Sequence, residues 1–429
     1  MSKRQSSKCL LNKVSTLGNL RSAWKELNKS NPLSRGLSEE TIQSFGTSLE
    51  SNLKKIRGQL QNDKYLFSPT KGSIIKEKKS AKSLKKRPIQ ISEICDRLVQ
   101  RAIVRKIAPI LDKKFHLKNK ASFAYLKEIG VRDALMVMLK LYKRGYNICF
   151  EADIKCFFDT LDKGILFNKI FPALPDESLN GLITNALSQT VGNMVAFSKE
   201  DQLLFMSDGI PQGGALSPLF ANVYLSDFDR IMLGRGFHLI RYADDFIVMC
   251  KTREVAREAY VVAKEILEKN LNLEIHPLRE NDNAKTRILK IGQKKLDFLG
   301  NTFTGRFIQP RKKTVDKLIS RIKEITQYRD DLTLLTVLIE SNNLLNGWIS
   351  SYCHAEIGNV VDKIYRTINC RLGVFGNKIN WLRTREPINY EQYLYAGLPD
   401  LNSVLVERRK SLMKHKQDYR IFKDFWKNG

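Results

Sequence analysis

The sequence lacks the spacings that build metal knuckles, disulfide frameworks and membrane spans. It has seven cysteines and five histidines in 429 residues, and no two cysteines form a Cys-x-x-Cys pair, so no zinc module is indicated. Most cysteines lie in apolar stretches, which predicts reduced, buried thiols. No apolar run approaches the length of a membrane-spanning helix, and no signal-peptide core follows Met1–Ser7. We therefore expect a globular, cytoplasmic protein without a membrane partner.

Acidic residues are scarce relative to basic ones. Lys and Arg number 73 against 45 Asp and Glu, which gives a formal net charge of +28. Apolar residues make up 42% of the chain, enough for roughly two to four packed subdomains. Positive charge spread along a globular chain predicts a polyanionic partner, and it favours nucleic acid over a membrane surface.

Two adjacent carboxylates separate two apolar runs near the middle of the chain. Asp244 and Asp245 lie between His238–Ile240 and Phe246–Cys250, a pattern that predicts two strands joined by a tight turn. Neighbouring carboxylates repel each other unless a cation lies between them, and Mg²⁺ prefers such oxygen ligands. Asp-Asp is also a common turn sequence with no metal, so the pair alone leaves both interpretations open.

A third carboxylate favours the metal. Asp153 follows the apolar strand Ile148–Phe150 and precedes Phe157 and Phe158. An acid at the end of a buried strand is costly without a ligand. If this strand neighbours those around Asp244, the carboxylates form a cage suited to an in-line displacement with two metal ions.

Three further stretches are candidates for contacts with nucleotides or nucleic acid. Ile210–Pro218 contains two adjacent glycines, which allow close approach of the backbone to a ligand or form a plain turn. Lys71–Arg87 holds eight basic residues, and we expect a basic loop between two strands that neutralises a triphosphate or is merely solvated. A helix after Arg311 has an apolar face and, elsewhere on its surface, the basic residues Lys312, Lys313, Lys317 and Arg321.

The remaining patterns predict an α+β protein. We expect helices within residues 1–66, one of them starting near Ser38, an amphipathic helix over Asp96–Leu111, a single helix after Pro218, a strand over Leu271–Ile275 and a hairpin over Lys295–Phe303. A strand, a helix and a strand around the acidic turn indicate a sheet with helices on one face.

Together these motifs resemble those of reverse transcriptases, specifically the bacterial group II intron-like lineage. The resemblance covers about residues 65–375 and rests on Lys86–Ile89, Asp96–Ala102, Ala152–Asp159, Ile210–Pro218, Tyr242–Asp245, Lys285–Arg287, Phe298–Gly300 and Leu344–Tyr352. It implies a right-hand polymerase with an antiparallel palm sheet. The implied parts are a helical N-terminal extension at 1–66, fingers at 67–150, a palm at 151–307 with part of the fingers interleaved at about 162–208, and a helical thumb with a basic tail at 308–429.

The resemblance also implies roles at the catalytic centre. It implies that two Mg²⁺ ions, which Mn²⁺ can replace, are bound by Asp153, Asp244 and Asp245 with help from the carbonyl of Ile154. It implies that Lys285 is the general acid that protonates pyrophosphate.

Further implied roles concern the substrates. The resemblance assigns Lys86 and Arg87 to the triphosphate, Phe158 to the wall that excludes a 2′-hydroxyl, and Gln212 to the nucleotide or template. It implies a primer grip formed by Phe298, Leu299 and Gly300, and an RNA-binding thumb helix that carries Lys312, Lys313, Lys317 and Arg321.

Two absences bear on the biology. No Cys-rich or His-rich endonuclease motif follows residue 375, and no Val-Thr-Gly of the kind found in retron enzymes occurs in the thumb region. The sequence most resembles defence-associated reverse transcriptases. We therefore expect an RNA-directed DNA polymerase that extends a DNA or RNA primer with dNTPs to make cDNA, together with a structured non-coding RNA in antiphage defence. The alternatives are a group II intron maturase without endonuclease and an RNA-binding splicing factor.

Overall fold

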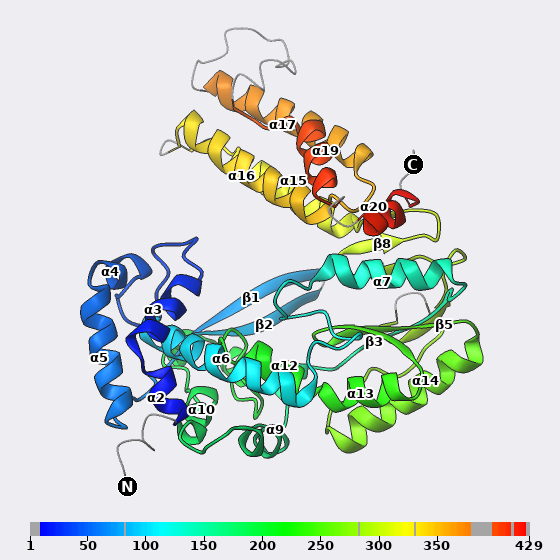
Figure 1. The fold of residues 1–429 in the computed structure, drawn as a ribbon. Coiled ribbons are helices and arrows are strands. Elements are labelled where there is room, and N and C mark those ends of the chain that lie inside the picture. Colours follow the sequence, from blue (N-terminus) through cyan, green and yellow to red (C-terminus); the bar gives the residue numbers. More distant parts are fainter. Residues whose placement is uncertain are drawn as a thin grey trace. The chain divides into compact units, whose positions relative to one another are not determined.

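The computed structural model describes residues 9–80, 83–281, 284–329, 332–378, 397–412 and 416–425. The chain divides into two compact units, each described here by itself. Unit 1 comprises Met1–Gly130, Phe150–Val248 and Glu254–Arg287, and unit 2 comprises Val131–Cys149, Met249–Arg253 and Ile288–Gly429. Helices and strands occur in both units (Figure 1), which confirms the predicted α+β class. Among the described residues, no helix is both long and apolar enough to cross a membrane.

The described part of unit 1 begins with four short helices, followed by a long one. The short helices are α2 (Leu10–Val14), α3 (Leu17–Glu26), α4 (Ile42–Thr47) and α5 (Leu49–Gln61), and the long helix is α6 (Ile94–Phe115). Helices α2 and α3 pack on α6, α5 packs on α2 and α3, and α4 packs on α5. The prediction of a helix start near Ser38 is wrong. Thr41 caps α4 in a capping box with Ser44, whereas the Ser38 hydroxyl donates to Glu93, 2.6 Å away.

A long antiparallel ribbon follows, built from β1 (Lys71–Ser80) and β2 (Ser83–Ile91). The prediction of a basic loop between two short strands is wrong, because the strands run through most of the basic segment. The pairing extends from Lys71 opposite Ile91 out to Ser80 opposite Ser83. Each added pair satisfies backbone N–H and C=O groups that a loop would leave to water.

Four strands form the central sheet, in the order β4 (His238–Tyr242), β5 (Asp245–Cys250), β3 (Ile148–Asp153) and β6 (Arg287–Lys290). All of β4 and most of β3 and β5 belong to unit 1. Two residues separate β4 from β5, so these neighbours are antiparallel. The rings of Phe150 and Phe246 meet edge to face at 5.9 Å, and helices α13 (Ser226–Gly234) and α14 (Arg253–Glu265) lie along this sheet (Figure 1).

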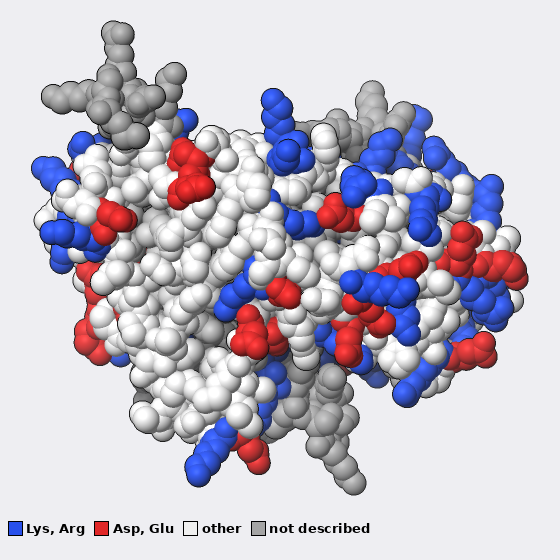
Figure 2. Space-filling view, turned by 90° about the horizontal axis from the view of Figure 1, so that it is seen from below, with Lys and Arg blue, Asp and Glu red and all other residues white. Residues whose placement is uncertain are grey.

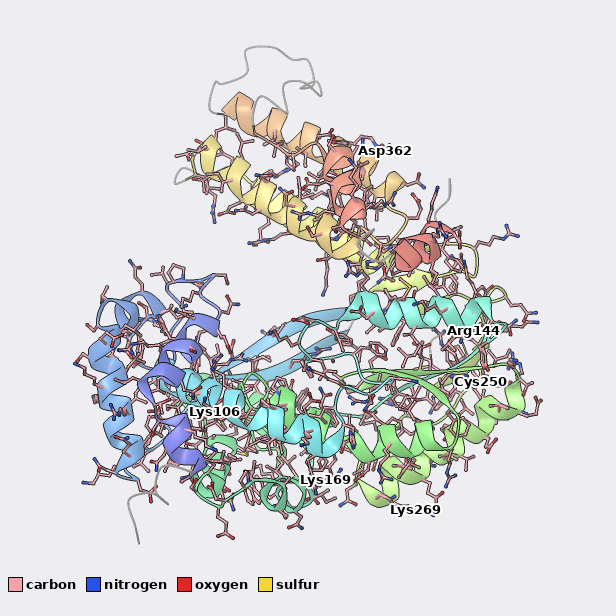
Figure 3. The ribbon with its side chains drawn as sticks, viewed as in Figure 1. Lys106, Arg144, Lys169, Cys250, Lys269 and Asp362 are labelled. Atoms are coloured by element: carbon pink, nitrogen blue, oxygen red, sulfur yellow. The ribbon has the colours of Figure 1, made fainter. Side chains whose placement is uncertain are left out.

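Two predictions in unit 1 need correction. The single helix expected after Pro218 is two helices, α12 (Ser217–Tyr224) and α13. Lys169, labelled in Figure 3, donates to the carbonyls of Val223 and Tyr224 at the end of α12 and pairs with Asp227 in the first turn of α13. The strand expected over residues 271–275 is absent. Only Ile275 forms a bridge, with Ile154, because this run, in which every second residue is buried, meets just the end of β3.

The other helices of unit 1 are short. They are α8 (Phe157–Thr160), α9 (Lys163–Ile170), η1 (Phe171–Ala173), α10 (Asn180–Leu187), η2 (Met194–Ala196), α11 (Lys199–Leu203) and the π-helical turn η3 (Ile266–Asn270).

Unit 2 has its own apolar core. Its elements are α7 (Val131–Lys143), a three-stranded antiparallel sheet of β7 (Leu296–Phe298), β8 (Asn301–Phe303) and β9 (Ile308–Pro310), and helices α15 (Lys312–Ile325), α16 (Leu334–Tyr352), α17 (Gly358–Lys378), α19 (Leu401–Leu412) and α20 (Lys416–Lys423). The hairpin over Lys295–Phe303 is confirmed. The apolar face of α15 packs against α16 and α17, as its spacing predicts.

The seven cysteines are free thiols. Cys149, Cys250 and Cys353 are buried, as predicted, but Cys156 and Cys370 are exposed. On the face drawn in Figure 2, basic and acidic side chains are intermixed. The basic residues therefore do not form one continuous positive patch on that face.

Candidate active site

The β4–β5 turn holds its acidic residues in a constrained backbone. Ala243 has a φ of 59°, a left-handed conformation that is unfavourable for a residue with a Cβ atom. The Nη1 of Arg241 donates to the carbonyl of Ala243 at 3.0 Å and so fixes the turn from beneath. Asp244 completes the turn, and Asp245 begins β5.

Arg241 is itself held by a buried network. Its side chain is fully buried and donates to both carboxylate oxygens of Asp229, at 2.7 and 2.6 Å. It also donates to Asn222 at 3.2 Å and to Ser122 at 2.9 Å. Asn119 adds a hydrogen bond to Asp229 at 3.1 Å. A bidentate, fully satisfied guanidinium is the form in which a buried charge is tolerated.

Asp153 ends β3, the strand beside β5 in the sheet. The predicted adjacency of the strands that carry Asp153 and Asp245 is therefore observed. The segment from Glu274 to His276 pairs with the chain just after Asp153, since the amide of Lys155 donates to the carbonyl of Glu274 at 2.8 Å. This pairing brings the imidazole of His276 to 3.9 Å from the Asp153 carboxylate.

Lys285 reaches the same carboxylate. Its ammonium forms an ion pair with Asp153 and donates to Nε2 of His276 at 2.9 Å. A bridge between Leu278 and Thr286 closes the loop that carries the lysine. The structure thus places Lys285, predicted as the general acid, in direct contact with a predicted metal ligand.

The predicted metal ligands are not gathered as a metal cluster. Among the residues that the structure describes, no group of three or more His, Cys, Asp or Glu side chains is arranged to hold an ion. The donor chemistry nevertheless fits a hard divalent cation, because carboxylate oxygens are its preferred ligands. Asp153 is about one-third exposed and already attracts the positive charge of Lys285. The predicted ligands are unchanged: Asp153, Asp244, Asp245 and the carbonyl of Ile154.

Phe158 lies in α8, with its ring 5.2 Å from that of Phe157. Its carbonyl accepts a hydrogen bond from the amide of Ile210 at 2.9 Å. A Cβ atom at Gly209 would lie 2.0 Å from this carbonyl oxygen, so only glycine allows the two segments to approach.

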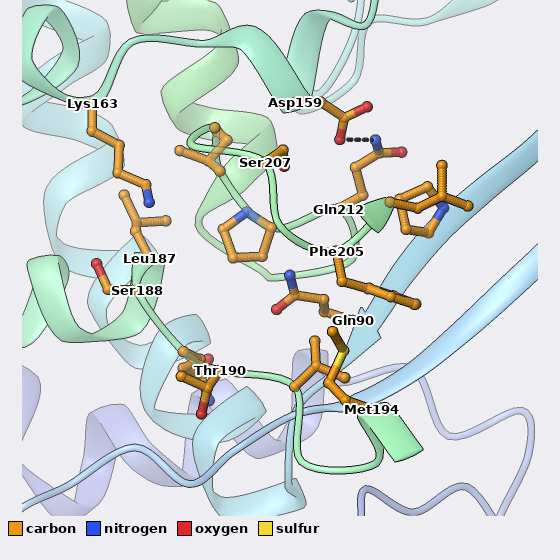
Figure 4. Close-up of a pocket in the computed structure, with 17 residues that line it drawn as sticks. Gln90, Asp159, Lys163, Leu187, Ser188, Thr190, Met194, Phe205, Ser207 and Gln212 are labelled. Atoms are coloured by element: carbon orange, nitrogen blue, oxygen red, sulfur yellow. Dashed lines mark hydrogen bonds between the residues drawn. The ribbon is translucent and has the colours of Figure 1, made fainter. Parts of the chain in front are cut away.

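Gln212 points toward the helix that carries Phe158. Its side-chain amide donates to Asp159 at 2.9 Å, in the wall of a cavity of about 340 Å³ (Figure 4). Gly213 has a φ of 115°, and a Cβ there would lie 2.7 Å from the carbonyl of Gln90. Gln100 on α6 accepts from the amide of Ala215 at 2.8 Å. The loop is therefore positioned by β2 and α6.

The predicted triphosphate ligands lie on β2. Lys86 forms a salt bridge with Asp201 at 2.6 Å. This hydrogen bond raises the pKa of Lys86 and lowers the pKa of Asp201. Arg87 is exposed on the same strand. A triphosphate would therefore compete with Asp201 for Lys86.

The predicted primer grip is the turn of a hairpin in unit 2. Leu299 and Gly300, both with positive φ, connect β7 to β8. A Cβ at Gly300 would lie 2.8 Å from the hydroxyl of Tyr352, which explains the glycine. The α15 residues proposed to bind RNA are all exposed, and Arg321 pairs with Glu324 at 2.7 Å. They are Lys312, Lys313, Lys317 and Arg321.

Several residues of the site are not evident from the sequence. His276 and Asp229 reach it only through the tertiary fold. Tyr125 is half exposed with a φ of 61°, and burial together with the nearby charge of Asp244 raises its pKa. The sequence gave only a weak indication of the residues on α6. Gln100 and Arg101 belong to the Asp96–Ala102 segment, where polar side chains interrupt an apolar helix.

The chain belongs to the reverse transcriptase (RNA-dependent DNA polymerase) family, whose model matches residues 75–303. It is 28% identical over 199 residues to the group II intron-encoded protein LtrA of Lactococcus lactis subsp. cremoris, covering 46% of this chain and 31% of LtrA. It is 26% identical over 230 residues to the protein YkfC of Escherichia coli, covering 45% of this chain and 58% of YkfC. The chain therefore spans less than two thirds of either relative.

Solved structures with a similar chain path include a partial Cas6-RT-Cas1–Cas2 complex, with a TM-score of 0.35 and 24% identity over 61% of this chain and 43% of that chain. Another is a telomerase from Candida albicans, solved with a fragment of telomeric RNA, with a TM-score of 0.36 and 13% identity over 89% of this chain and 68% of that chain.

Proposed function

We propose that the protein is an RNA-directed DNA polymerase that adds dNTPs to a DNA or RNA primer. The observation that carries the proposal is the β4–β5 turn, which Arg241 holds in place beside the end of β3. The turn presents Asp244 and Asp245, and Asp153 lies at the end of the neighbouring strand with Lys285 against its carboxylate. Family membership supports the same reaction class.

In this proposal Asp153, Asp244 and Asp245 hold two Mg²⁺ or Mn²⁺ ions with help from the carbonyl of Ile154. When bound, such ions supply charge stabilisation for in-line transfer of a nucleotidyl group. Lys285 carries the proton that the leaving pyrophosphate requires, and His276 accepts a hydrogen bond from its ammonium. A lysine held between a carboxylate and an imidazole keeps a fixed position for that transfer.

Residues on the elements around the acidic turn are proposed to contact the nucleotide, the template and the primer. Phe158 is proposed to lie against the sugar of the incoming nucleotide, and Gln212 against the nucleotide or template. Lys86 and Arg87 are proposed to bind the triphosphate, with release of Lys86 from Asp201. The hairpin of Phe298, Leu299 and Gly300 is proposed as the primer grip. We retain the proposed extension, fingers, palm and thumb with their predicted boundaries.

We favour a biological role in antiphage defence, in which the protein acts in the cytoplasm with a dedicated structured RNA. A group II intron maturase is the second candidate, and the similarity to the intron-encoded protein LtrA favours it. The two settings differ in the RNA that the protein binds. Sequencing of the RNA and cDNA that co-purify with the full chain, with and without phage, separates them: intron RNA supports the second candidate.

The test of the polymerase is primer extension on an RNA template. Wild-type protein should require Mg²⁺ or Mn²⁺, and Asp244→Asn/Asp245→Asn should stop extension because amides lose the charge that binds the ions. Glu50→Gln is the matched control, since it removes an exposed helical carboxylate, paired with Arg21, that is not among the proposed ligands. Extension at the wild-type rate by the double variant would show that the assigned site is wrong.

A further inference from the structure

Helix α20 and the residues just after it are anchored on two other elements of unit 2, α7 and the β7–β9 sheet (Figure 1). The ring of Phe425 meets that of Phe303 on β8 edge to face, with the centroids 5.3 Å apart. The carbonyl of Phe425 accepts a hydrogen bond from the amide of Ile308 on β9 at 3.3 Å. Lys143 of α7 forms an ion pair with Asp424. The segment is therefore held through its rings, its backbone and a charge.

Phe422 of α20 packs against the imidazole of His354, in the loop that follows α16. The two rings lie 5.5 Å apart, and both side chains are buried. The carbonyls on either side of this histidine, those of Cys353 and Ala355, accept hydrogen bonds from Arg409 of α19 at 3.2 and 2.9 Å. The backbone around His354 is therefore fixed by α19, and one side of its ring is covered by α20.

His354 donates a hydrogen bond to the β7–β8 hairpin. Its Nε2 lies 3.3 Å from Oδ1 of Asn301. The side-chain nitrogen of Asn301 donates to the carbonyl of Leu299 at 3.0 Å, so Oδ1 of Asn301 is the acceptor for His354. Burial, with a smaller contribution from the charge of Arg132, lowers the pKa of His354 to about 4. Near neutral pH the imidazole is therefore uncharged and carries one hydrogen, which this contact places on Nε2.

The hairpin turn that receives this hydrogen-bond chain has a backbone that needs support. Leu299 has a φ of 49° and Gly300 a φ of 75°. The left-handed conformation is unfavourable for leucine, and such a residue keeps it only where its surroundings hold it. The carbonyl of Gly300 accepts from the amide of Arg311 at 2.9 Å, whereas the carbonyl of Leu299 is held by the side chain of Asn301. A side-chain substitution can therefore release one of these two bonds.

We propose that α20 positions the primer-grip turn through a relay of Phe422, His354 and Asn301, which keeps the turn in the shape that receives the primer strand. The inference rests on the primer grip proposed for Phe298, Leu299 and Gly300, and it adds the residues that hold the grip. Phe422 is fully buried and His354 is 2% exposed, so both act through the turn and not by touching the primer.

The relay predicts a particular kinetic change. If the turn adopts the receiving shape only part of the time, the apparent affinity for the primer falls by that fraction. A saturating primer draws the turn back into this shape, so kcat is restored. Weakening the relay should therefore raise KM for the primer–template and leave both kcat and KM for dNTP unchanged.

The experiment measures primer extension on an RNA template by the full chain and its His354 variants. His354→Leu removes the donor but keeps apolar volume, and it should raise KM for the primer–template roughly 3- to 10-fold, as expected for one lost hydrogen bond. His354→Gln, whose Nε2 can reach the same oxygen of Asn301, should return KM to near the wild-type value. Lys423→Gln, at an exposed position of α20, is the control and should change neither constant.

A second substitution tests the part of the relay that lies in α20. Phe422→Leu keeps an apolar side chain but loses the ring that covers His354, so it should also raise KM for the primer–template. The double variant Phe422→Leu/His354→Leu should show no larger increase than His354→Leu alone, because both changes act through one hydrogen bond. Additive increases would overturn the relay. Urea midpoints identify variants that do not fold, and Phe422→Leu decides the question if His354→Leu is one of them.

Gly300→Ala separates failure of the relay from failure of the proposals beneath it. The added Cβ would lie 2.8 Å from the hydroxyl of Tyr352, so this variant distorts the turn directly. A raised primer KM in Gly300→Ala, with wild-type values in folded His354→Leu and Phe422→Leu, would overturn the relay alone. An unchanged KM in Gly300→Ala as well would overturn the primer grip and the relay together. Wild-type protein that extends no primer would refute the polymerase proposal and, with it, both assignments.

Discussion

Arg241 and Asp229 form a fully buried bidentate ion pair directly beneath the turn that carries Asp244. Both guanidinium–carboxylate contacts are shorter than 2.8 Å, and each side chain is only 1% exposed. The remaining donors of Arg241 go to Ser122, Asn222 and the carbonyl of Ala243. The pair therefore links α13, which contains Asp229, to the candidate catalytic turn.

Asp229→Asn should destabilise the protein by about 3–5 kcal/mol, because it leaves a buried guanidinium without its counter-charge. Arg230→Gln is the matched control. It removes an exposed partner of Asp227 on the same helix, and a surface pair contributes less than about 1 kcal/mol. Urea unfolding of both variants measures the difference. Equal midpoints would mean that the buried pair does not stabilise unit 1.

The sequence predicts the strands around the candidate catalytic turn, but it does not predict the ion pairs that hold the site. Apolar runs on either side of Asp244 predict the strands, because the composition of a short run is a local property of the chain. The Arg241–Asp229 pair joins residues that are 12 positions apart on a strand and a helix, and the Lys285–Asp153 pair spans 132 positions. Neither pairing has a local signal, since only the packed fold brings the groups together.

The two incorrect predictions of extended structure also arose because tertiary pairing has no local signal in the sequence. Eight basic residues close in sequence suggested a basic loop between two strands, but strand pairing continues through most of the Lys71–Arg87 run. The apolar run over residues 271–275 looks like a strand by composition, yet only the end of β3 is available to pair with it. Whether an extended segment becomes a strand depends on a partner edge, which composition does not reveal.

Phe158→Ala should admit ribonucleotides. In the proposed site the Phe158 ring lies where a 2′-hydroxyl would need space, and its backbone is fixed by the hydrogen bond from Ile210. Removing the ring should therefore change selectivity with little movement of the chain. Incorporation of rATP and dATP is compared in the variant and in Phe158→Tyr, which retains the ring. The same ratio of rATP to dATP in Phe158→Ala and wild type would remove Phe158 from this role.

Asp96 should make stability depend on pH. Its carboxylate is buried and accepts from Tyr65 at 2.7 Å and from the amide of Ser68 at 3.0 Å. Burial raises the pKa of Asp96 to about 6, so the folded state binds the proton more tightly than the unfolded state. The stabilisation is complete below about pH 4 and is lost as pH rises through about 6.

The measurement is the difference in unfolding free energy between Asp96→Asn and wild type from pH 4 to pH 7. As pH rises, the wild type should lose stability relative to the variant by up to about 3 kcal/mol, because the pKa of Asp96 is raised by about two units. Glu50→Gln, at an exposed pair with Arg21, controls for the loss of a surface carboxylate. A difference that stays constant with pH would contradict the raised pKa.

RNA binding and catalysis should be separable through α15. Four of the exposed basic residues of this helix were predicted to bind RNA, and they lie in unit 2 on the side of α15 away from its apolar core. Each phosphate contact released should reduce the slope of log K against log salt by roughly 0.7–0.9. Changing all four to Gln should therefore weaken binding of the co-purified RNA and flatten its salt dependence, while extension of a short, saturating primer–template should fall less. The residues changed are Lys312, Lys313, Lys317 and Arg321.

A matched variant, called the α14 variant, removes the same charge from α14 and from the adjoining turn η3. The exposed basic residues that it changes are Arg253, Arg257 and Lys264 in α14 and Lys269 in η3. If α15 contacts RNA, the α15 variant should alter the slope and the α14 variant should leave it near the wild-type value, because net charge alone acts equally in both. Affinity measured at two salt concentrations decides between them. An unaltered slope in the α15 variant would mean that its lysines and arginine only solvate the helix.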